Sequence, residues 1–219
     1  MSTTERDVFR LRDDRLRVEG DGLKSPYFDI QPGLIMGKDG KPMYDRPLIR
    51  EIPSVLVVMW GRDALGLIRL GMIRQKRPPA DDPKFPGNNH PPATFAQVVM
   101  GYLHGDSIQE GALKEKVEEA GKSRVLDMKV LSFPQFNMEP NTFATWHSVA
   151  FMEVDLSTVD EGHTAEGEFI TSVTYKTVSD VLMHIAEGWD ETGTYYRGGG
   201  TLAALMIFFA SRPDLFPGQ

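Results

Sequence analysis

Two apolar, β-rich runs separated by a short turn constrain the fold most strongly. The first run is SVLVVMW at 54–60 and the second is LIRLGMIRQ at 67–75, with GRDALG between them. Short runs that are rich in Val, Ile and Leu and bounded by glycine are typical of β-strands. We therefore predict that the two runs pair as a hairpin inside a central sheet.

Further strands are expected on both sides of this hairpin. The turn-forming segment GKDGKP at 37–42 separates two short extended pieces, which predicts a hairpin-like N-terminal extension. The segment at 77–94 contains six prolines, so it is neither a helix nor an interior strand, and it is a candidate binding loop or a surface insertion without a role. The remaining predicted extended segments are 27–36, 43–50, 97–103, 125–135, 143–154 and 168–178.

Three helices are predicted, at about 108–120, 180–187 and 202–211. Ser107 and Glu110 stand in the positions of a capping box at the start of the first helix, and Gly121 stands where a left-handed C-cap residue belongs. We expect Ser179 and Thr201 to precede the second and third helices. Because the third helix is apolar almost all round, we expect it to be buried between layers.

Charge and composition limit the partners of the chain. The net charge of −7 and the pI near 5.3 disfavour binding to a nucleic-acid polymer or to an anionic membrane surface. The chain has no cysteine, so thiolate-ligated metals and disulfides are excluded. The longest apolar run, at 202–210, is about half the roughly 20 residues that a membrane span requires. We expect a soluble, cytoplasmic protein.

The stretch KEKVEEAGK at 114–122 gathers carboxylates on one side of the first helix. At 100° per residue, Glu118 and Glu119 flank Glu115, while Leu113 and Val117 fall on the far side. One interpretation is a solvated surface helix, because Lys114 and Glu118 form an acceptable i,i+4 pair. The helix is therefore expected to have an apolar face and an acidic face.

The second interpretation is a metal site. Glu115 and Glu119 are like charges at i,i+4, and this arrangement costs roughly 0.2–0.5 kcal/mol even on an exposed helix. If the two groups were partly buried at about 4 Å, the repulsion would approach roughly 4 kcal/mol at an effective dielectric constant near 20. Mg²⁺ would compensate, because it takes oxygen ligands and commonly joins carboxylates to substrate phosphates.

This stretch resembles the Nudix box, whose pattern is G-x5-E-x7-R-E-U-x-E-E-x-G-U with U aliphatic. In GDSIQEGALKEKVEEAG at 105–121, Glu115, Glu118, Glu119 and Gly121 match the pattern, and Lys114 replaces the arginine. The other departures are Asp106 for the earlier glutamate, Lys116 and Lys122 for the aliphatic residues, and a loop one residue short after Gly101.

The resemblance extends to the ADP-ribose pyrophosphatase branch of the Nudix family. IRQKRP at 73–78 is similar to the strand end that precedes the box in that branch, and AEGEF at 165–169 is similar to its acidic loop. The match covers about residues 45–212. It implies an α/β/α sandwich with a mixed β-sheet over 51–219, and an N-terminal β extension over 1–50 that takes part in a homodimer.

The resemblance also implies roles for individual residues. Metal ligands would be Glu115, Glu119, Glu168 and the backbone carbonyl of Met100, with Mg²⁺ or Mn²⁺ as the metal. Catalytic roles would fall to Glu166, as the base, and to Glu118, as a nearby ligand or water-mediated partner. Residues that contact the substrate would be Arg77, Arg50 and Gln97.

Three functions remain open at this point. The first is hydrolysis of a nucleoside diphosphate linked to another moiety, such as ADP-ribose or another nucleotide sugar, to a nucleoside monophosphate and a sugar phosphate. The second is a Nudix-fold sensor that binds a nucleotide without turning it over, favoured by Lys114 and Gln97, because lysine does not reproduce the arginine fork. The third is an acidic globular domain that has no metal site.

Overall fold

The structure is a computed structural model that describes eight segments of the chain. Within residues 17–50 it describes backbone segments and one side chain, that of Ile49. Of Arg77 it describes the backbone alone. The described residues belong to two compact units, at 17–53 and 54–216. The described segments are 17–19, 22–24, 28–36, 42–77, 93–131, 147–165, 169–196 and 198–216.

The first unit contains a four-stranded sheet in the order β1-β2-β3-β4. All neighbouring strands in it are antiparallel, and β3 and β4 pair from Phe28↔Glu51 to Met36↔Pro42. The hairpin expected in the N-terminal extension is therefore present, whereas its role in a dimer stays a prediction. The strands are β1 Arg17–Glu19, β2 Gly22–Lys24, β3 Phe28–Met36 and β4 Pro42–Glu51.

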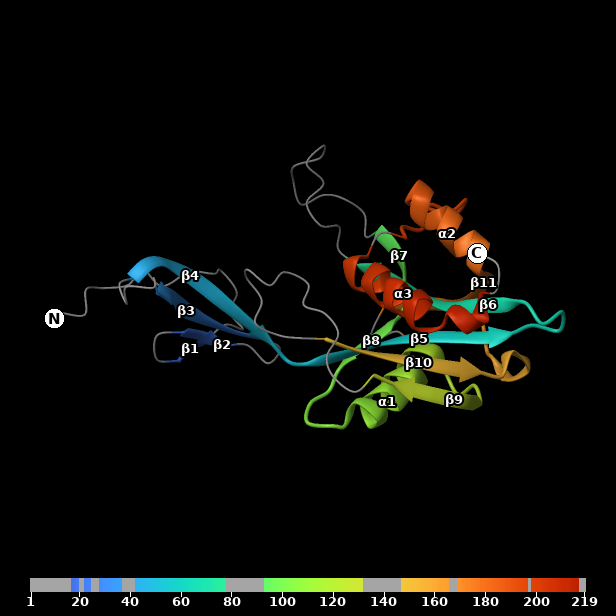
Figure 1. Ribbon diagram of the computed structural model, residues 1–219, viewed down its shortest axis with the longest axis horizontal. Helices are drawn as coiled ribbons and strands as arrows, with labels where there is room; N and C mark the ends of the chain where they lie inside the picture. Colours follow the sequence, from blue (N-terminus) through green and yellow to red (C-terminus); the bar gives the residue numbers. More distant parts are fainter. Residues whose placement is uncertain are drawn as a thin grey trace. The chain divides into compact units, whose positions relative to one another are not determined.

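The second unit is built on a seven-stranded mixed sheet (Figure 1). Its main order is β11-β6-β5-β10-β9, with β7 added to β6 and β8 added to β5. Strands β5 and β10 are parallel, and the other named pairs are antiparallel. The strands are β5 Ser54–Arg62, β6 Ile68–Arg77, β7 Ala93–Gln97, β8 Val99–Tyr102, β9 Val125–Val130, β10 Ser148–Val154 and β11 Ile170–Thr177.

The predicted central hairpin is confirmed, because β5 and β6 pair from Met59↔Gly71 to Arg62↔Ile68. Beyond this half the two strands take different partners, and β8 pairs with β5 while β7 pairs with β6. The single strand predicted at 97–103 is wrong for this reason. It breaks at Val98, whose backbone N–H donates to Thr201 Oγ1 at 3.2 Å instead of continuing a strand.

Three helices cover the two faces of this sheet (Figure 1). Alternate residues of β5 point to opposite sides, as a strand requires. Leu56, Val58 and Trp60 belong to a core cluster with residues of α2 and α3, whereas Val55 and Val57 belong to a cluster with residues of α1. The helices are α1 Ile108–Ala120, α2 Val178–Glu187 and α3 Gly199–Ser211, with short 3-10 turns at Leu156–Thr158 and Pro213–Leu215.

The N-terminus of α1 has the predicted capping pattern, whereas the C-terminus does not. The capping box is confirmed: Ser107 Oγ accepts from the backbone N–H of Glu110 at 3.2 Å, and Glu110 Oε2 accepts from the backbone N–H of Ser107 at 3.1 Å. Gly121 has φ 77° and ψ −173°, so its positive φ suits glycine, but it is not the left-handed helical cap that was predicted.

The other two helices begin earlier than expected. Thr177, not Ser179, caps α2, because its hydroxyl accepts from the backbone N–H of Asp180 at 3.1 Å. The N-cap of α3 is Gly198, and no side chain caps this end. The expected burial of α3 on all sides is also wrong, because Met206 is 72% exposed.

Three further features concern the chain outside the main core. The predicted strand at 125–135 ends at Val130, and residues 132–146 and most of the proline-rich segment lie outside the described residues.

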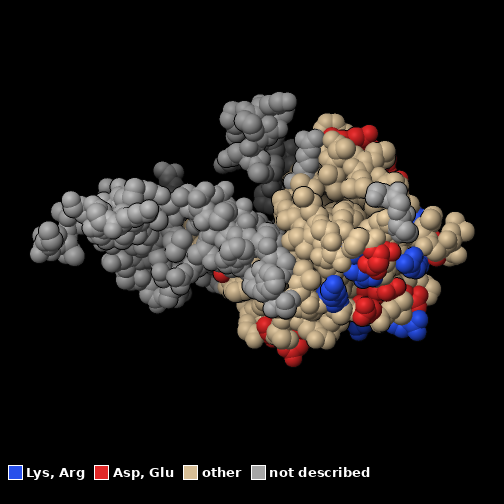
Figure 2. Space-filling model, in the orientation of Figure 1, with Lys and Arg blue, Asp and Glu red and all other residues tan. Residues whose placement is uncertain are grey.

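Among the described residues, no helix combines the length and the apolar character needed to cross a lipid bilayer. On the face shown in Figure 2, basic side chains lie beside acidic ones. Arg212 and Asp214 form an ion pair of 2.9 Å.

Candidate functional site

Helix α1 turns an unexpected side toward the sheet. Leu113 and Val117, which were expected to form its apolar face, are 37% and 40% exposed. The helix packs instead through small residues, and a Cβ added to Gly111 would lie 2.5 Å from Leu103 Cδ2. Since this close approach needs small side chains, it decides which face is inside. The buried residues of α1 are Gly111, Ala112, Lys116, Glu119 and Ala120.

Two of the predicted carboxylates consequently reach strand β8. Glu119 is only 3% exposed, and its Oε2 accepts a hydrogen bond from the backbone N–H of Met100 at 3.0 Å. Glu115 is partly buried, and its carboxyl group lies against Gly101, where an added Cβ would be 1.7 Å from Glu115 Cδ. Carboxylates from successive turns of α1 thus meet successive residues of one strand.

A buried lysine lies between these two glutamates in the sequence. Lys116 is 1% exposed, and its Nζ donates to the backbone carbonyl of Ser123 at 2.5 Å. Burial lowers the pKa of the Lys116 amine. Lys116, which replaces an aliphatic residue of the Nudix box pattern, faces the protein interior.

The two carboxylates are a suitable but minimal set for Mg²⁺. Magnesium is usually bound through one or two carboxylates, with waters and substrate phosphates as the other ligands. Glu115 and Glu119 supply two carboxylates. Within the described segments no group of three or more His, Cys, Asp or Glu could hold a metal ion. The third predicted ligand, Glu168, and the predicted base, Glu166, lie outside those segments.

The chain on either side of Glu166 and Glu168 is described, and part of it contacts α1. Ala165 and Ile170 pair through two backbone hydrogen bonds of 3.2 and 3.0 Å. Ahead of them, His163 Nε2 lies 3.1 Å from the backbone carbonyl oxygen of Glu118. The chain just before Ala165 therefore contacts the same helix that carries Glu115 and Glu119.

The remaining predicted site residues are placed less completely. Gln97 ends β7 opposite Ile73 and is partly exposed, and the Glu118 side chain is exposed. Arg77 ends β6 and Arg50 lies in β4 of the first unit, and the structure describes neither side chain. For Met100 the structure gives a bond from its N–H, while the predicted role of its carbonyl group stays a prediction.

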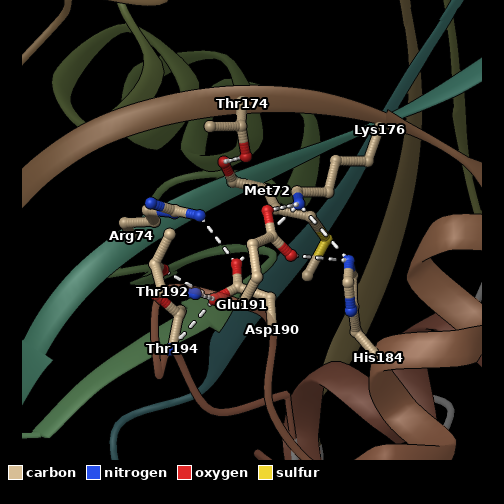
Figure 3. Close-up of polar contacts among 9 residues, drawn as sticks. All are labelled: Met72, Arg74, Thr174, Lys176, His184, Asp190, Glu191, Thr192 and Thr194. Carbon is tan, nitrogen blue, oxygen red and sulfur yellow. Dashed lines mark hydrogen bonds and ion pairs between the residues drawn. The ribbon is translucent and has the colours of Figure 1, made fainter.

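A buried polar cluster around Asp190 was not identified from the sequence (Figure 3). The Asp190 side chain has no exposed surface, and its Oδ1 accepts from the backbone N–H groups of Thr192 and Thr194 at 2.9 and 3.1 Å. Arg74 of β6 donates to Oδ2 at 2.7 Å, and Lys176 of β11 lies 3.8 Å from the same oxygen. The sequence signal would have been the Asp-x-Thr-x-Thr spacing, which is typical of a turn closed by an aspartate.

The pKa of Asp190 results from opposing influences. Burial of the carboxyl group is the largest and acts to raise the pKa. Hydrogen bonds from Thr192 and Thr194 and the charge of Arg74 together outweigh it, so the pKa is lowered from its ordinary value. The carboxylate therefore stays ionised and fixes the 190–194 turn to the sheet.

Comparison with known proteins gives the chain no family. No protein-family model matches it, and no curated protein matches it. The structure gives the fold of the second unit as a seven-stranded mixed sheet with three helices packed against it.

Proposed function

We propose that the protein is a Mg²⁺-dependent hydrolase of the Nudix type, which cleaves a nucleoside diphosphate linked to another moiety. The observation that carries this proposal is the meeting of Glu115 and Glu119 with the Met100–Gly101 segment of β8. A surface helix has no need to turn a glutamate inward while Leu113 and Val117 face solvent.

The energetics of the pair support a cation. Taking a carboxylate out of water is costly unless hydrogen bonds or opposite charge compensate it. The Met100 N–H supplies one hydrogen bond to Glu119, and Glu115 lies one turn away with the same charge. A divalent ion at this place would neutralise both carboxylates at once. Because Glu119 is buried and Glu115 is partly buried one turn away, we favour the metal-site interpretation over the solvated surface helix.

The proposed reaction assigns a role to most of the predicted residues. Glu115 and Glu119, with Glu168 and the Met100 carbonyl, would hold Mg²⁺ or Mn²⁺, which when bound stabilises negative charge on phosphate oxygens and favours ionisation of water. Glu166 would take a proton from the attacking water, and Glu118 would be a nearby ligand of the metal or its water-mediated partner. Substrate contacts are assigned to Arg77 and Gln97. ADP-ribose is the first substrate to test, giving AMP and ribose 5-phosphate.

A nucleotide sensor without turnover is the second candidate, and the burial of Lys116 favours it. The Lys116 ammonium is a positive charge that α1 already carries into the protein interior. In this candidate the Lys116 ammonium is the positive charge on the inner side of α1, in place of a metal ion. Exposed Lys114, in the place of the family's arginine, points the same way.

A turnover assay with a metal control separates the two candidates. The panel holds ADP-ribose, another nucleotide sugar, a dinucleotide and a nucleoside triphosphate, each with Mg²⁺ and with chelator. Glu119→Gln is the test variant, because the amide oxygen still accepts from the Met100 N–H while the charge is removed. Glu187→Gln, an exposed carboxylate of α2, is the matched control.

The hydrolase is supported if turnover needs Mg²⁺, is lost in Glu119→Gln and persists in Glu187→Gln. Binding of a nucleotide without turnover of any panel member would replace it with the sensor. Calorimetric titration with Mg²⁺ and Mn²⁺ tests the site itself. A titration without specific binding would reject the metal site and leave an acidic globular domain.

A further inference from the structure

A hollow of about 530 Å³ lies between helix α2 and the turn that follows it. Small-molecule pockets have volumes of roughly 300–1,000 Å³, so the hollow has the size of a ligand site. Helix α2 packs on the face of the main sheet opposite to α1, so the hollow is separate from the proposed metal site (Figure 1). Its wall includes Met183 and His184 of α2, and Trp189, Glu191 and Gly193 of the turn.

Two apolar side chains of the hollow are exposed. Trp189 is 55% exposed and Met183 is 47% exposed. Tryptophan is usually well buried, and within the described segments no other aromatic ring contacts Trp189. An indole face attracts a cation more strongly than the other aromatic side chains do, and a thioether packs readily against methyl and methylene groups.

The charged side chains at the hollow favour a positively charged ligand. None of the described residues that line it is lysine or arginine. Glu191 is exposed, and its carboxyl oxygens lie 3.7 Å from Lys176 Nζ and 3.9 Å from His184 Nε2. Both distances are longer than a hydrogen bond, so the carboxylate keeps lone pairs with which to accept from a ligand.

His184 adds no positive charge to the hollow. Its Nε2 lies 3.3 Å from Lys176 Nζ, and because an ammonium group can only donate, Nε2 accepts and the ring is neutral. His184 is 4% exposed, and its Nδ1 has no hydrogen-bond partner among the described residues. Since buried polar groups nearly always have a partner, an unpaired one in the wall of a hollow indicates a site that a ligand or a water completes.

The chemistry of the hollow favours an organic cation over a metal ion. No group of three or more His, Cys, Asp or Glu in the described part of the chain could hold a metal ion. Exposed indole and thioether surface offers nothing to a hard metal ion, which takes oxygen ligands. The same surface suits a cation that carries methyl or methylene groups.

The turn that carries Trp189 and Glu191 is fixed before a ligand arrives (Figure 3). Asp190 lies between them, and its carboxylate accepts from two backbone N–H groups of the turn at 2.9 and 3.1 Å. Arg74 donates to the same carboxylate at 2.7 Å. A surface that is fixed before binding loses little conformational entropy when a ligand binds.

We propose that the hollow beside α2 binds a small organic cation. The ammonium group of the ligand lies against the indole face of Trp189 and near the Glu191 carboxylate, while its methyl or methylene groups pack against Met183. The site does not depend on the proposed hydrolase, because the two sites lie on opposite faces of the sheet.

Two probes of the same shape isolate the contribution of charge. Choline carries a quaternary ammonium group, and 3,3-dimethyl-1-butanol has carbon in place of that nitrogen. Both are titrated with the full chain in the absence of Mg²⁺, and the NMR signals of the probe give the affinity. The wild type should bind choline about 2- to 30-fold more tightly than the neutral analogue, the range that a cation–π contact supplies.

Two variants test the residues that contact the cation. Trp189→Leu keeps an apolar side chain but removes the π-face, so choline binding should weaken by about 2- to 30-fold, and Trp189→Phe should bind choline more tightly than Trp189→Leu. Glu191→Gln keeps the shape and removes the charge, so choline binding should weaken by about 1.5- to 5-fold. Its unchanged affinity for the neutral analogue would show that the hollow is still folded.

Two further variants are controls for the place of binding. Glu161→Gln removes the same charge from an exposed position outside the hollow and should bind choline as the wild type does. Glu119→Gln alters the proposed metal site and should also leave choline binding unchanged. A loss in Glu161→Gln equal to that in Glu191→Gln would indicate attraction by net charge alone, and a loss in Glu119→Gln would place the cation at α1. Either result would overturn the proposal.

The remaining outcomes are equally decisive. No choline binding by the wild type, equal affinity for the two probes, or choline binding that survives both Trp189→Leu and Glu191→Gln would overturn the site. Nα-acetyl-lysine amide presents a basic side chain as a partner protein would, and tighter binding of this probe than of choline would overturn the assignment to a small cation. Choline binding by a protein that turns over no substrate keeps this site and loses only the proposed hydrolase.

Discussion

Replacement of Gly101 by alanine should separate metal binding from stability. A Cβ at this position would lie 1.7 Å from Glu115 Cδ and 2.1 and 2.2 Å from its two carboxyl oxygens. To reach an ordinary contact of 3.4 Å, the Glu115 carboxyl group has to move away by about 1.7 Å. Glu115 is partly exposed, so its side chain can swing outward without disturbing the core.

Gly101→Ala should lower turnover without lowering the free energy of unfolding. A misplacement of about 1 Å in a catalytic group typically costs about 100-fold in rate, so turnover should fall by at least about that factor. Folding should be unchanged or improved by up to about 0.5–1 kcal/mol, because alanine in a strand loses less conformational freedom than glycine.

Thermal unfolding with and without Mg²⁺ measures both effects in one assay. A ligand at about 100 times its Kd stabilises the folded state by about 2.7 kcal/mol, so the wild type should gain Tm on addition of Mg²⁺. Gly101→Ala should keep its Tm without Mg²⁺ and lose most of the gain. Gly199→Ala makes the same change where no atom lies within 4 Å and should behave as the wild type.

A double-mutant cycle identifies the cause. In a Glu115→Ala background there is no carboxylate for the new methyl group to displace, so Gly101→Ala should have no further effect on Mg²⁺ binding. Undiminished Mg²⁺ affinity in Gly101→Ala alone would refute the reasoning that Glu115 is a metal ligand held against β8.

Three further predictions concern stability. Val117→Ala should change the free energy of unfolding by less than about 0.5 kcal/mol, because Val117 faces solvent, whereas Ala112→Leu should cost about 1–3 kcal/mol by overpacking, and urea unfolding of both measures this. Lys116→Met should raise the free energy of unfolding at pH 7. The folded-state pKa of Lys116 is lowered from 10.5, so the unfolded chain binds the proton more tightly and the wild type gains stability as pH rises toward 10.5. The stability advantage of Lys116→Met over the wild type should therefore shrink over the same pH range. An advantage independent of pH would contradict this. Asp190→Asn should destabilise by about 3–5 kcal/mol because it leaves Arg74 without its buried partner. Because the pKa of Asp190 is lowered, its contribution to the free energy of unfolding is present above the ordinary value of 3.8 and is lost as pH falls through the lowered value. The stability of Asp190→Asn should therefore fall less steeply than that of the wild type as the solution is acidified. A Tm unchanged from wild type at pH 7 would refute this role.

Several parts of the site follow from local sequence alone. The spacing of Glu115 and Glu119 places them on successive turns of one helix whatever surrounds it. Ser107 and Glu110 cap that helix through contacts within four residues, which is why the capping box was predicted correctly. The central hairpin was also predictable, because its strands are long, apolar and joined by a short turn.

Other parts could not be read from a pattern because they depend on residues distant in the chain. The strand expected at 97–103 breaks at Val98, since Thr201, about a hundred residues later, takes its N–H. Asp190 is bound in the interior by Arg74 of β6, which lies 116 residues earlier in the chain. The roles of Glu166, Glu168, Arg77 and Arg50 remain predictions from resemblance.

The orientation of α1 shows where the two sources of information divide. The sequence by itself determined that a helix with clustered carboxylates exists, because helix period and caps are local properties. Only the tertiary structure decided that Glu119 faces inward and Val117 outward. The physical reason is that close packing at Gly111 against Leu103 outweighs the burial of Leu113 and Val117, and an individual helix carries no information about the surface it will meet.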